Sequence, residues 1–460
     1  MKKNLTRRSF LAASLAAGSL PSVIPAGVVR AQEGRPTPSN RVTFALIGSG
    51  SMGTGGMRNV LKNKDAQVIA TCDPFKSRRE RGAKLVDETY QTTGCAAYGD
   101  FRELLARKDL DCVEIATGDY WHVPLALYAV RAGKDVYVEK PLGVAMQWAW
   151  VLREEIRKRK AVFQFGTWQR SQRHFRNACE LVRNGVLGKV QRVEAWSHGL
   201  GSDVGGIFNE GSAIRNFHIN GLKPSPVPDD LDYNMWQGPA PARVHTNVRT
   251  MTHGIWHISD YALGFIAGWG IHPIDIVQWG LGTDHSAPVS YQGTGRFPDV
   301  RGLFDTLATW DVQCQYGNGV ELHFMDWLTA KPIVEAYRPG CDHGTTFFGE
   351  KGWISVDRGS LRTSDKAWQK IQWGEKDITL YASKGSQWDN FIQCVRTREP
   401  TVNPIESAVN GDLICHLSDF AVRTGREIKW DPKTEKIIGD KEAELFLDRT
   451  PRAPWKVEPA

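Results

Sequence analysis

Three glycines near the amino end of the chain, Gly48, Gly50 and Gly53, have the G-x-G-x-x-G spacing of a dinucleotide-binding turn. The first glycine permits a tight turn, the second lets the backbone approach the phosphates, and the third lets a helix pack against a strand. Asp73 follows at the end of a second apolar run, where its carboxylate can bind the ribose hydroxyls. A glycine-rich turn before an ordinary helix would leave Asp73 unexplained, so we expect a dinucleotide site.

The segments around this turn have the pattern that such a site needs. Residues 42–47 form a short apolar run of the kind found in a strand buried on both faces. A helix is expected from about Met52 to Lys62, and its N-terminus would present free N–H groups to the phosphates. A second strand is expected over residues 67–72. The predicted cofactor-binding residues of the turn are Gly48, Ser49, Gly50, Ser51, Met52 and Gly53.

The acidic residue also bears on the choice of dinucleotide. The charge of Asp73 would repel the 2′-phosphate of NADP, so we expect NAD as the cofactor. Lys76, Ser77 and Arg78 follow closely and could neutralise that phosphate. NADP is therefore the second choice.

The order of the segments predicts two domains. Strands alternate with helices from residue 41 to about residue 166, which indicates a parallel sheet. From about residue 171 the pattern changes: a linking helix over residues 171–184 is followed by a strand, a loop-rich stretch over residues 199–255 and a helix over residues 271–281. The strands after that helix are joined to one another without helices, which indicates a largely antiparallel sheet. Closing helices are expected over residues 386–396 and 405–424. We therefore predict an α/β protein with a Rossmann domain over residues 41–168. A C-terminal α+β domain with a large, mostly antiparallel open sheet would span residues 169–460 and hold the substrate and oligomer contacts.

The first thirty-one residues have the features of a twin-arginine export signal. Arg7 and Arg8 lie in a basic start, a proline-interrupted apolar run follows from residue 11 to residue 29, and small residues precede a cleavage point after Ala31. The prolines and weak hydrophobicity disfavour a membrane anchor, and no later segment is long and apolar enough to span a bilayer. We expect the mature protein in the periplasm or outside the cell, with residues 32–40 as a linker or arm.

Charge and cysteine content narrow the class of protein. The chain has a formal net charge of +7, and residues 1–31 hold five basic and no acidic groups, which leaves +2. This small excess suggests no nucleic-acid partner. The eight cysteines are scattered, without a C-x-x-C pair. Because twin-arginine export carries proteins that fold in the reducing cytoplasm, we expect mostly free thiols.

Two further stretches carry a resemblance to a known family. They are ATGDYWHVPLALYAVRAGKDVYVEKP, residues 116–141, and GFIAGWGIHPIDIVQWGLG, residues 264–282. Together with the glycine turn they resemble the Gfo/Idh/MocA family of sugar and inositol oxidoreductases. The likeness extends to FQFGTWQRS, FFGEKGWISV and the closing segments, so it covers essentially the whole mature chain. It implies a Rossmann domain, then an α/β domain whose sheet often forms a subunit interface, and hence a homo-oligomer, either a dimer or a tetramer.

The resemblance implies two catalytic residues. Lys140, in the E-K-P motif, matches the family's lysine that holds the substrate hydroxyl beside the nicotinamide, and its charge would favour loss of the hydroxyl proton. His272 matches the family's histidine and is the candidate general base, since its reference pKa lies near neutrality. Asp275, one turn later, is expected on the same side of the helix, where it could orient His272 or contact substrate. Taken alone, the lysine could be a surface ion-pair residue and the histidine a core residue.

The chain departs from the family pattern at one position. Many members carry an aspartate four residues before this histidine, where this chain has Gly268. The missing carboxylate removes a potential hydrogen bond to substrate, or a partner that raises the basicity of His272. Ordinary alcohol oxidation is therefore less secure as an expectation.

Five more residues belong to the predicted site. Thr117 and His122 lie in the loop beside the cofactor, and His122 would either pack that loop or contact substrate. Glu139, before the catalytic lysine, is also assigned to cofactor binding. Trp168 and Arg170 follow the last Rossmann strand and are expected to face the cleft. There the tryptophan could stack on a sugar and the arginine could clamp a polar group.

We expect no metal. His253 and His257 lie at i, i+4 spacing, but the chain offers no adjacent E-x-x pattern and no obvious third ligand. Structural or substrate roles are favoured over zinc for this pair.

The expected compartment sharpens the function. No nicotinamide pool is replenished outside the cytoplasm, so the cofactor should travel tightly bound and be regenerated in place. The leading hypothesis is an NAD(P)-dependent oxidoreductase that takes hydride from a secondary hydroxyl of a carbohydrate or sugar-like polyol, with Lys140 and His272 in the roles above. The alternative is an NAD-dependent glycoside hydrolase that works by transient oxidation and elimination, which Gly268 favours slightly. A non-catalytic carbohydrate-binding protein is a third possibility.

Overall fold

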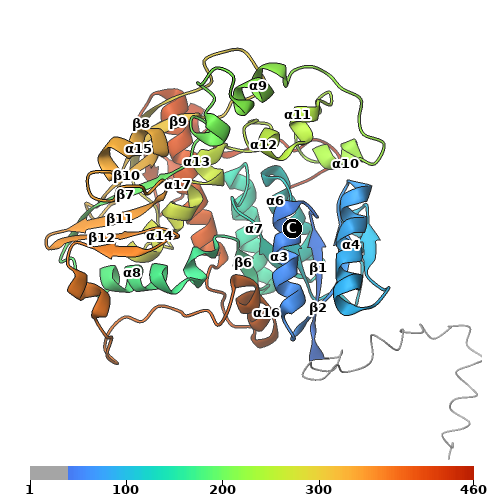
Figure 1. Ribbon diagram of the computed structural model, residues 1–460, viewed down its shortest axis with the longest axis horizontal. Helices are drawn as coiled ribbons and strands as arrows, with labels where there is room; N and C mark the ends of the chain where they lie inside the picture. The colour runs from blue at the N-terminus through green and yellow to red at the C-terminus, as the bar shows by residue number, and fades with distance from the viewer. Residues whose placement is uncertain (1–39, 460) are drawn as a thin grey trace, which may run out of the picture.

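Two sheets organise the protein, and Figure 1 shows them side by side, the parallel sheet at the right and the second sheet at the left. The computed structural model describes residues 40–459. The predicted export signal and nearly all of the predicted linker therefore lie outside the described residues. The parallel sheet has six strands in the order β3-β2-β1-β4-β5-β6, and the second sheet has nine in the order β13-β12-β11-β7-β10-β9-β8-β14-β15.

The first part of the chain forms the parallel sheet and its covering helices. Its elements are β1 (Val42–Ile47), α3 (Ser51–Lys62), β2 (Ala66–Cys72), α4 (Lys76–Tyr90), β3 (Ala96–Tyr98), α5 (Phe101–Leu105), β4 (Cys112–Ile115), α6 (Asp119–Arg131), β5 (Asp135–Val138), α7 (Met146–Arg159) and β6 (Phe163–Phe165). The order of strands reverses between β1 and β4, which is where a sheet of this kind binds its ligand, outside the carboxyl ends of the strands. The predicted Rossmann architecture is confirmed.

The middle of the chain links the sheets through short helical segments. They are η2 (Trp168–Ser171), α8 (Arg173–Arg183), β7 (Val190–Ser197), η3 (Asp203–Gly205), α9 (Ala213–Asn220), α10 (Tyr233–Gln237), α11 (Asn247–Thr250), α12 (Thr252–Ile255), α13 (Phe265–Gly268) and α14 (Ile271–Leu281). The stretch over residues 199–255, expected to be loop-rich, thus contains several short helices. In Figure 1, α9 to α12 lie in the upper part of the view, above the parallel sheet.

The rest of the chain completes the second sheet. Its elements are β8 (Ser290–Arg296), β9 (Thr309–Gln315), β10 (Glu321–Asp326), α15 (Trp327–Val334), β11 (Gly344–Gly349), β12 (Gly352–Val356), β13 (Leu361–Thr363), η4 (Lys366–Lys370), α16 (Gln387–Thr397), α17 (Ile405–Thr424), β14 (Ile428–Asp431), β15 (Lys436–Ile437), α18 (Lys441–Glu444) and η5 (Leu445–Leu447). Only β7 and β10 pair in parallel within this sheet, so the predicted mostly antiparallel character is confirmed.

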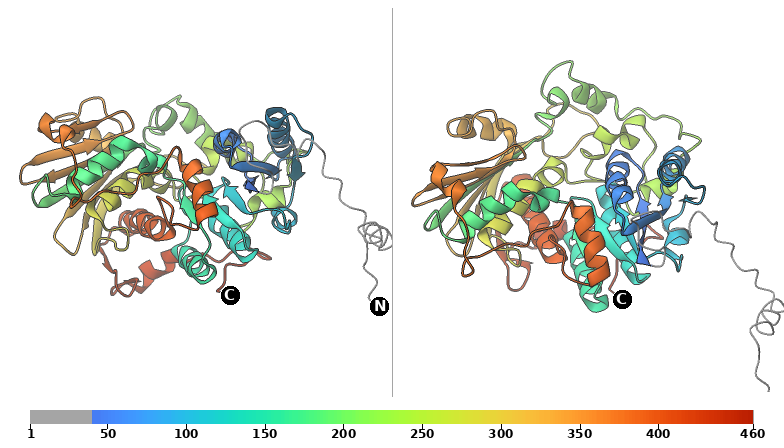
Figure 2. Two further views of the ribbon diagram at one scale, coloured as in Figure 1. Left: turned by 90° about the horizontal axis from the view of Figure 1, so that it is seen from below. Right: turned by 60° about the horizontal axis from the view of Figure 1, so that its bottom comes forward.

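Helices α8, α14 and α17 cover one face of the second sheet, and α15 packs on the strands from the other side. Segments late in the chain also return to the parallel sheet, as both views of Figure 2 show for α16. Trp388 of α16 stacks on Tyr137 of β5 with 5.7 Å between ring centroids. Trp455 packs against Trp121 of α6 at 4.8 Å. These contacts tie the two sheets together, so side chains from both can form one site.

All eight cysteines are free thiols in the structure, and seven of them are buried. The expectation of mostly free thiols is thus confirmed, and burial keeps them inert as small apolar side chains. Within the described residues, the structure contains no helix that could cross a membrane.

Candidate active site

The glycine turn joins β1 to α3 in a conformation that close packing requires. Gly48 has φ +97°, and a Cβ atom there would lie 2.4 Å from the carbonyl oxygen of Ala116. A Cβ atom on Gly53 would lie 2.1 Å from the carbonyl oxygen of Gly48, so this glycine lets the helix approach the strand. Gly50 has no atom within 4 Å of a built Cβ and faces open space. The first and third glycines are thus needed for packing, and the second leaves room for a ligand.

A cavity of about 290 Å³ lies beside this turn. Six of the predicted cofactor-binding residues line it: Gly48, Gly50, Ser51, Met52, Asp73 and Thr117. Four others, Ser49, Gly53, His122 and Glu139, are buried and are not among its lining residues. The opposite wall comes from α10 to α12, through Met235, Trp236, Thr250, Met251, Thr252, Ile255 and Trp256.

Asp73 fixes the turn to the end of β2. Its two carboxylate oxygens accept hydrogen bonds from the backbone N–H groups of Ser49 and Phe75, each at 2.8 Å. Burial raises the pKa of Asp73, and those two N–H donors together with Arg78 oppose the shift. Ser49 is fully buried, so its contribution to the site is its backbone.

Of the three residues that could neutralise a 2′-phosphate, only Arg78 lines the cavity. Its guanidinium carbon lies 4.0 Å from the centroid of the Phe75 ring. Ser77 instead donates a hydrogen bond to Asp230, and Lys76 pairs with Glu80 at 3.9 Å.

His122 joins the cofactor loop to the E-K-P segment. Its Nδ1 lies 2.7 Å from the carbonyl oxygen of Pro141, and its Nε2 lies 3.3 Å from that of Thr117. Burial lowers the pKa of His122 to about 4, so the ring is neutral at physiological pH. Of the two roles left open by the sequence, the geometry matches loop packing.

Lys140 reaches across to the second part of the chain. Its Nζ donates a hydrogen bond of 2.9 Å to the carbonyl oxygen of Gly268, at the end of α13. Burial lowers the pKa of Lys140, whereas the carboxylates of Glu139 and Asp119 raise it. Position 268, where many family members carry an aspartate, therefore contacts the lysine, and in this chain the backbone carbonyl oxygen of Gly268 makes the contact.

Asp119 is a site residue that the sequence reasoning missed. It begins α6, directly after the cavity-lining Thr117–Gly118 segment, and is 6 % exposed. Burial raises its pKa to about 7, with the charge of Lys140 opposing and that of Asp412 adding to the shift. The signal available in the sequence was an acidic residue shortly after a strand of the parallel sheet.

His272 lies near the start of α14 and is 2 % exposed. Its Nδ1 is buried and has no hydrogen-bond partner. Burial lowers its pKa well below the usual value, and the charges of Lys140, Arg358 and His343 add to the shift. A neutral imidazole beside an ammonium group can accept a proton from a hydroxyl that the lysine polarises. Lys140 and His272, from separate parts of the chain, therefore converge.

Arg170 and Asp275 do not face such a site. Arg170 Nε donates to Asp275 Oδ1 at 2.9 Å, and its two terminal nitrogens bind both oxygens of Asp284 at 2.9 and 2.7 Å. The other oxygen of Asp275 accepts from Thr167 at 2.8 Å and from Asn403 at 3.2 Å. Burial opposes the charge of Arg170, but the two aspartates outweigh it and raise its pKa. The structure corrects the expectations of a substrate clamp and of a partner for the histidine, because this network is internally satisfied.

Trp168 instead meets an arginine that the sequence did not single out. The guanidinium carbon of Arg358 lies 4.7 Å from the Trp168 ring centroid and 4.3 Å from that of Trp269. Trp269 in turn contacts the His272 ring edge-on, with 5.5 Å between centroids. Arg358 is in the turn between β12 and β13, so nothing in its local sequence announced this placement.

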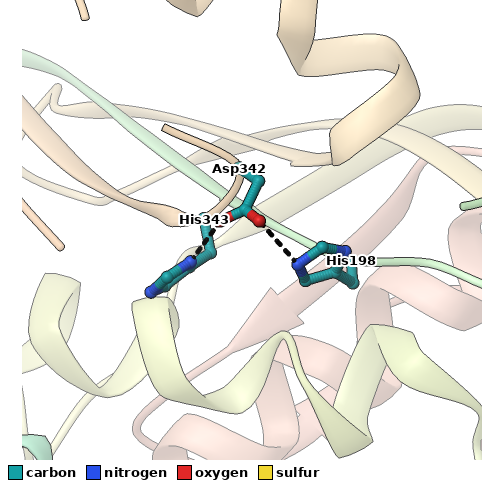
Figure 3. Close-up of side chains that lie close together, drawn as sticks. All are labelled: His198, Asp342 and His343. Atoms are coloured by element: carbon teal, nitrogen blue, oxygen red, sulfur yellow. Dashed lines mark hydrogen bonds and ion pairs between the residues drawn. The ribbon is translucent and has the colours of Figure 1, made fainter. Parts of the chain in front are cut away.

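A cluster of His198, Asp342 and His343 flanks Trp269 (Figure 3). Asp342 bridges the two imidazoles, at 2.6 Å to His343 Nδ1 and 3.2 Å to His198 Nε2. One potential ligand atom from each of the three lies within 4.8 Å of the others, a spacing that a metal ion can use. The positive charge of Arg358, which helps to lower the pKa of His343 after burial, would repel a cation there. We therefore interpret the cluster as two imidazoles bridged by one carboxylate, and not as a metal site.

His253 and His257 also share one carboxylate. Their ring nitrogens lie 3.3 and 3.1 Å from the same oxygen of Asp203. This arrangement ties α12 to the η3 segment, which matches the structural role favoured from the sequence.

Comparison with known proteins follows the two halves of the fold. A sequence model described as an oxidoreductase family with NAD-binding Rossmann fold matches residues 42–167. A second, described as the C-terminal alpha/beta domain of the same oxidoreductase family, matches residues 212–326 and 328–457. The chain belongs to the Gfo/Idh/MocA family. It therefore has the NAD-binding Rossmann domain of an oxidoreductase family.

Similar proteins bear the name of a glycosidase family. A glycosyl hydrolase family 109 protein of Stenotrophomonas maltophilia is 28% identical over 459 residues, covering 91% of this chain and 93% of that protein. Another, from Saccharopolyspora erythraea, is 30% identical over 202 residues, covering 40% of this chain and 44% of that protein.

Solved structures share the fold at low identity. The WlbA dehydrogenase of Bordetella pertussis, in complex with NADH and UDP-GlcNAcA, aligns with a TM-score of 0.58 at 14% identity, over 85% of this chain and 99% of that chain. GenD2 from gentamicin A biosynthesis, in complex with NAD, aligns with a TM-score of 0.57 at 17% identity, over 85% of this chain and 97% of that chain.

Proposed function

We propose that the protein is an NAD(P)-dependent oxidoreductase that oxidises a secondary hydroxyl of a sugar or sugar-like polyol. The observation that carries the proposal is that Lys140 donates a hydrogen bond to Gly268, four residues before His272, and that its charge acts on that imidazole. The ammonium would hold and polarise the hydroxyl, and the neutral imidazole would take its proton. The carbon-bound hydrogen leaves with its electron pair, so the sugar becomes a ketone.

The cavity fits a dinucleotide. Gly50 leaves open space at the N-terminus of α3, where free N–H groups suit a pyrophosphate, and Asp73 and Arg78 line the part next to β2. A bound nicotinamide supplies a hydride acceptor there. NAD is the expected form and NADP the second choice, since Asp73 and Arg78 favour different dinucleotides.

The proposal includes tight cofactor binding, twin-arginine export to the periplasm or cell exterior, and a homo-oligomeric state. The first of these is supported by the lining of the cavity, to which residues of α10 to α12 contribute together with the glycine turn, so a bound cofactor would contact both.

A second candidate function has its own support. Relatives named as family 109 glycosyl hydrolases suggest an NAD-dependent glycoside hydrolase, in which oxidation is transient and elimination cleaves the glycoside. The same two side chains would act in its first step. The two candidates differ in whether the sugar leaves oxidised.

Both candidates can be tested on purified protein. Absorbance at 340 nm after addition of sugars reports oxidation, and a nitrophenyl glycoside panel in heavy water reports cleavage with deuterium uptake beside the oxidised carbon. An oxidoreductase should reduce its cofactor in proportion to sugar consumed. Release of nitrophenol with deuterium uptake and no net reduction would replace the first candidate by the second. Absence of bound cofactor and of turnover would leave a carbohydrate-binding protein.

A further inference from the structure

Arg358 is a partly buried cation without an acidic partner. Within residues 40–459, no carboxylate forms an ion pair or hydrogen bond with its guanidinium, and its Nε is buried and unpartnered. Burial lowers the pKa of Arg358 to about 10, and only the charge of Asp342 opposes this shift. Burying a cation without a counter-charge costs free energy, so the arrangement calls for a partner from outside the chain.

The carboxylates of Asp342 and Asp357 already bind other side chains. Asp342 is shared by His198 and His343, as the dashed lines of Figure 3 show. Asp357, the residue before Arg358, binds Arg338 and Cys341. Neither can turn to Arg358 without losing those contacts.

Arg358 lies close enough to the proposed catalytic pair for its charge to act on both side chains. The charge of Lys140 acts together with that of Arg358 on His272, after burial, to lower the pKa of the imidazole. Arg358 also helps, after burial and against the carboxylates of Glu139 and Asp119, to lower the pKa of Lys140. Lys140 is thus balanced by two carboxylates, whereas no carboxylate of residues 40–459 pairs with Arg358, so an anion from outside the chain would meet Arg358.

We propose that Arg358 binds an oxyanion carried by the substrate, a carboxylate or a phosphate, so that the protein acts on an acidic sugar. This inference rests on the proposed function, because it concerns the same site. A guanidinium offers five N–H donors in a planar fork that matches the oxygens of such groups. The indole rings of Trp168 and Trp269 hold the guanidinium in place while accepting none of those donors as strong hydrogen bonds.

The position of Arg358 would orient the sugar. Trp269 lies between Arg358 and His272 in the chain of ring contacts, so an anion on the arginine leaves the sugar ring beside the Lys140–His272 pair.

The test compares acidic with neutral sugars on the full-length purified protein. Glucuronate, galacturonate and glucose 6-phosphate are compared with glucose and galactose. Two measurements are made for each, the reduction of bound cofactor at 340 nm and the shift of the melting temperature. Acidic sugars should give the higher kcat/KM and the larger melting shift, and the uronates and the sugar phosphate separate carboxylate from phosphate recognition.

Variants identify the residue responsible. Arg358→Gln should lower the ratio of kcat/KM for acidic sugars to kcat/KM for neutral sugars about 10- to 100-fold, because a hydrogen bond to a charged group is lost. Arg358→Lys keeps the charge without the fork and should retain part of the preference. Arg362→Gln, which changes an exposed arginine of the adjacent strand β13, is the matched control and should alter neither value.

The outcomes separate the two proposals. Turnover of neutral sugars at least equal to that of acidic ones, or an equal loss on both with Arg358→Gln, overturns the acidic substrate and leaves the oxidoreductase standing. Melting shifts by acidic sugars that depend on Arg358, without any cofactor reduction, support the oxyanion site and count against the oxidoreductase. Neither shifts nor reduction overturns both.

Discussion

Arg170 and Arg358 are two arginines packed on tryptophans, and they differ in what neutralises them. Arg170 lies 5.3 Å from the Trp279 ring centroid and is bound by Asp275 and Asp284. Arg358 packs on two indole rings, and no carboxylate of residues 40–459 pairs with it. The paired arginine completes its own network and therefore holds helices together. The unpaired arginine has donors left over, and such donors mark the place where a ligand must complete the structure.

The same contrast separates the residues predicted from the sequence. Asp275 and Arg170 satisfy each other, whereas His272 keeps an unpartnered ring nitrogen and Lys140 donates only to a backbone oxygen. We interpret the satisfied pair as structural and the unpartnered groups of the site as available to a ligand. Five experiments test this interpretation, and the one with the greatest predicted change comes first.

Loss of either converging side chain should cost activity more than stability. His272→Asn or Lys140→Met is expected to lower the rate of cofactor reduction about 10²- to 10⁴-fold, because proton transfer or charge stabilisation is removed. Single-turnover absorbance at 340 nm measures the rate, and a melting curve serves as the control for folding. A variant that melts at a lower temperature but reacts at the parent's rate would show that the residue has a structural role, as Arg170 has.

Removal of the paired arginine should have the opposite signature. Arg170→Met leaves Asp275 and Asp284 as buried uncompensated charges, so the free energy of unfolding should fall by about 3–5 kcal/mol. Denaturant unfolding measures the change, with Arg358→Met as the comparison, which should be as stable as the parent or more so. Unchanged stability with weakened substrate binding would restore the clamp role first expected for Arg170.

A carboxylate at position 268 should move the pH profile. A built Cβ on Gly268 meets only Phe265, at 3.6 Å, so an aspartate has room. In Gly268→Asp the new charge opposes the burial that lowers the pKa of His272, and a base that must be neutral then works only at higher pH. The acid limb of kcat/KM should shift upward by about one pH unit, worth about 1.4 kcal/mol. Gly268→Ala controls for the added bulk, and an identical profile in both variants would separate this position from His272.

Asp119 should make stability depend on pH. Its folded pKa of about 7 lies above the ordinary value, so between the two the folded protein binds more protons and its free energy of unfolding falls as pH rises. Asp119→Asn lacks this loss. Relative to the parent, the variant should gain stability between about pH 5 and about pH 8, as urea titrations at both values would measure. A difference that is constant across this range would contradict burial of the carboxyl in the folded state.

Arg78 is a third arginine on an aromatic ring, at the cofactor cavity, and its loss should have the smallest effect. Arg78→Ala is expected to weaken NAD binding about 2- to 5-fold, as loss of an exposed cation–π contact would, and NADP binding more strongly. Calorimetric titration with both dinucleotides measures the two affinities, and Lys76→Ala, which changes a residue outside the cavity lining, is the control. Equal affinities in the parent and Arg78→Ala would show that Arg78 does not contribute to dinucleotide binding.

Local sequence was enough for the nucleotide half of the site. The spacing of Gly48, Gly50 and Gly53 and the acid at Asp73 depend on neighbours within one strand–turn–helix–strand unit, so their geometry follows from short-range rules. The alternation of strands and helices likewise predicted the parallel sheet. Helix α15 was not anticipated.

Side-chain direction within one helix was not predictable in the same way. The spacing of His272 and Asp275 puts both on a similar side of α14, yet Asp275 turns to Arg170, Thr167 and Asn403. Those partners lie in segments far away along the chain. Which of several nearby polar groups a carboxylate binds is decided by burial and competition, and neither is visible in a local pattern.

The sequence by itself determined the two-sheet fold class, the dinucleotide turn and, through the family resemblance, the lysine and histidine. Only the tertiary structure decided which charges are neutralised. Arg358 lies in the turn between β12 and β13 of the second sheet, and Asp119 begins α6 beside the parallel sheet. Both come near Lys140 only in the folded chain, where their charges act on its ammonium group. The physical reason is that charge neutralisation depends on distance in space, and the chain closes those distances only when both sheets have packed together.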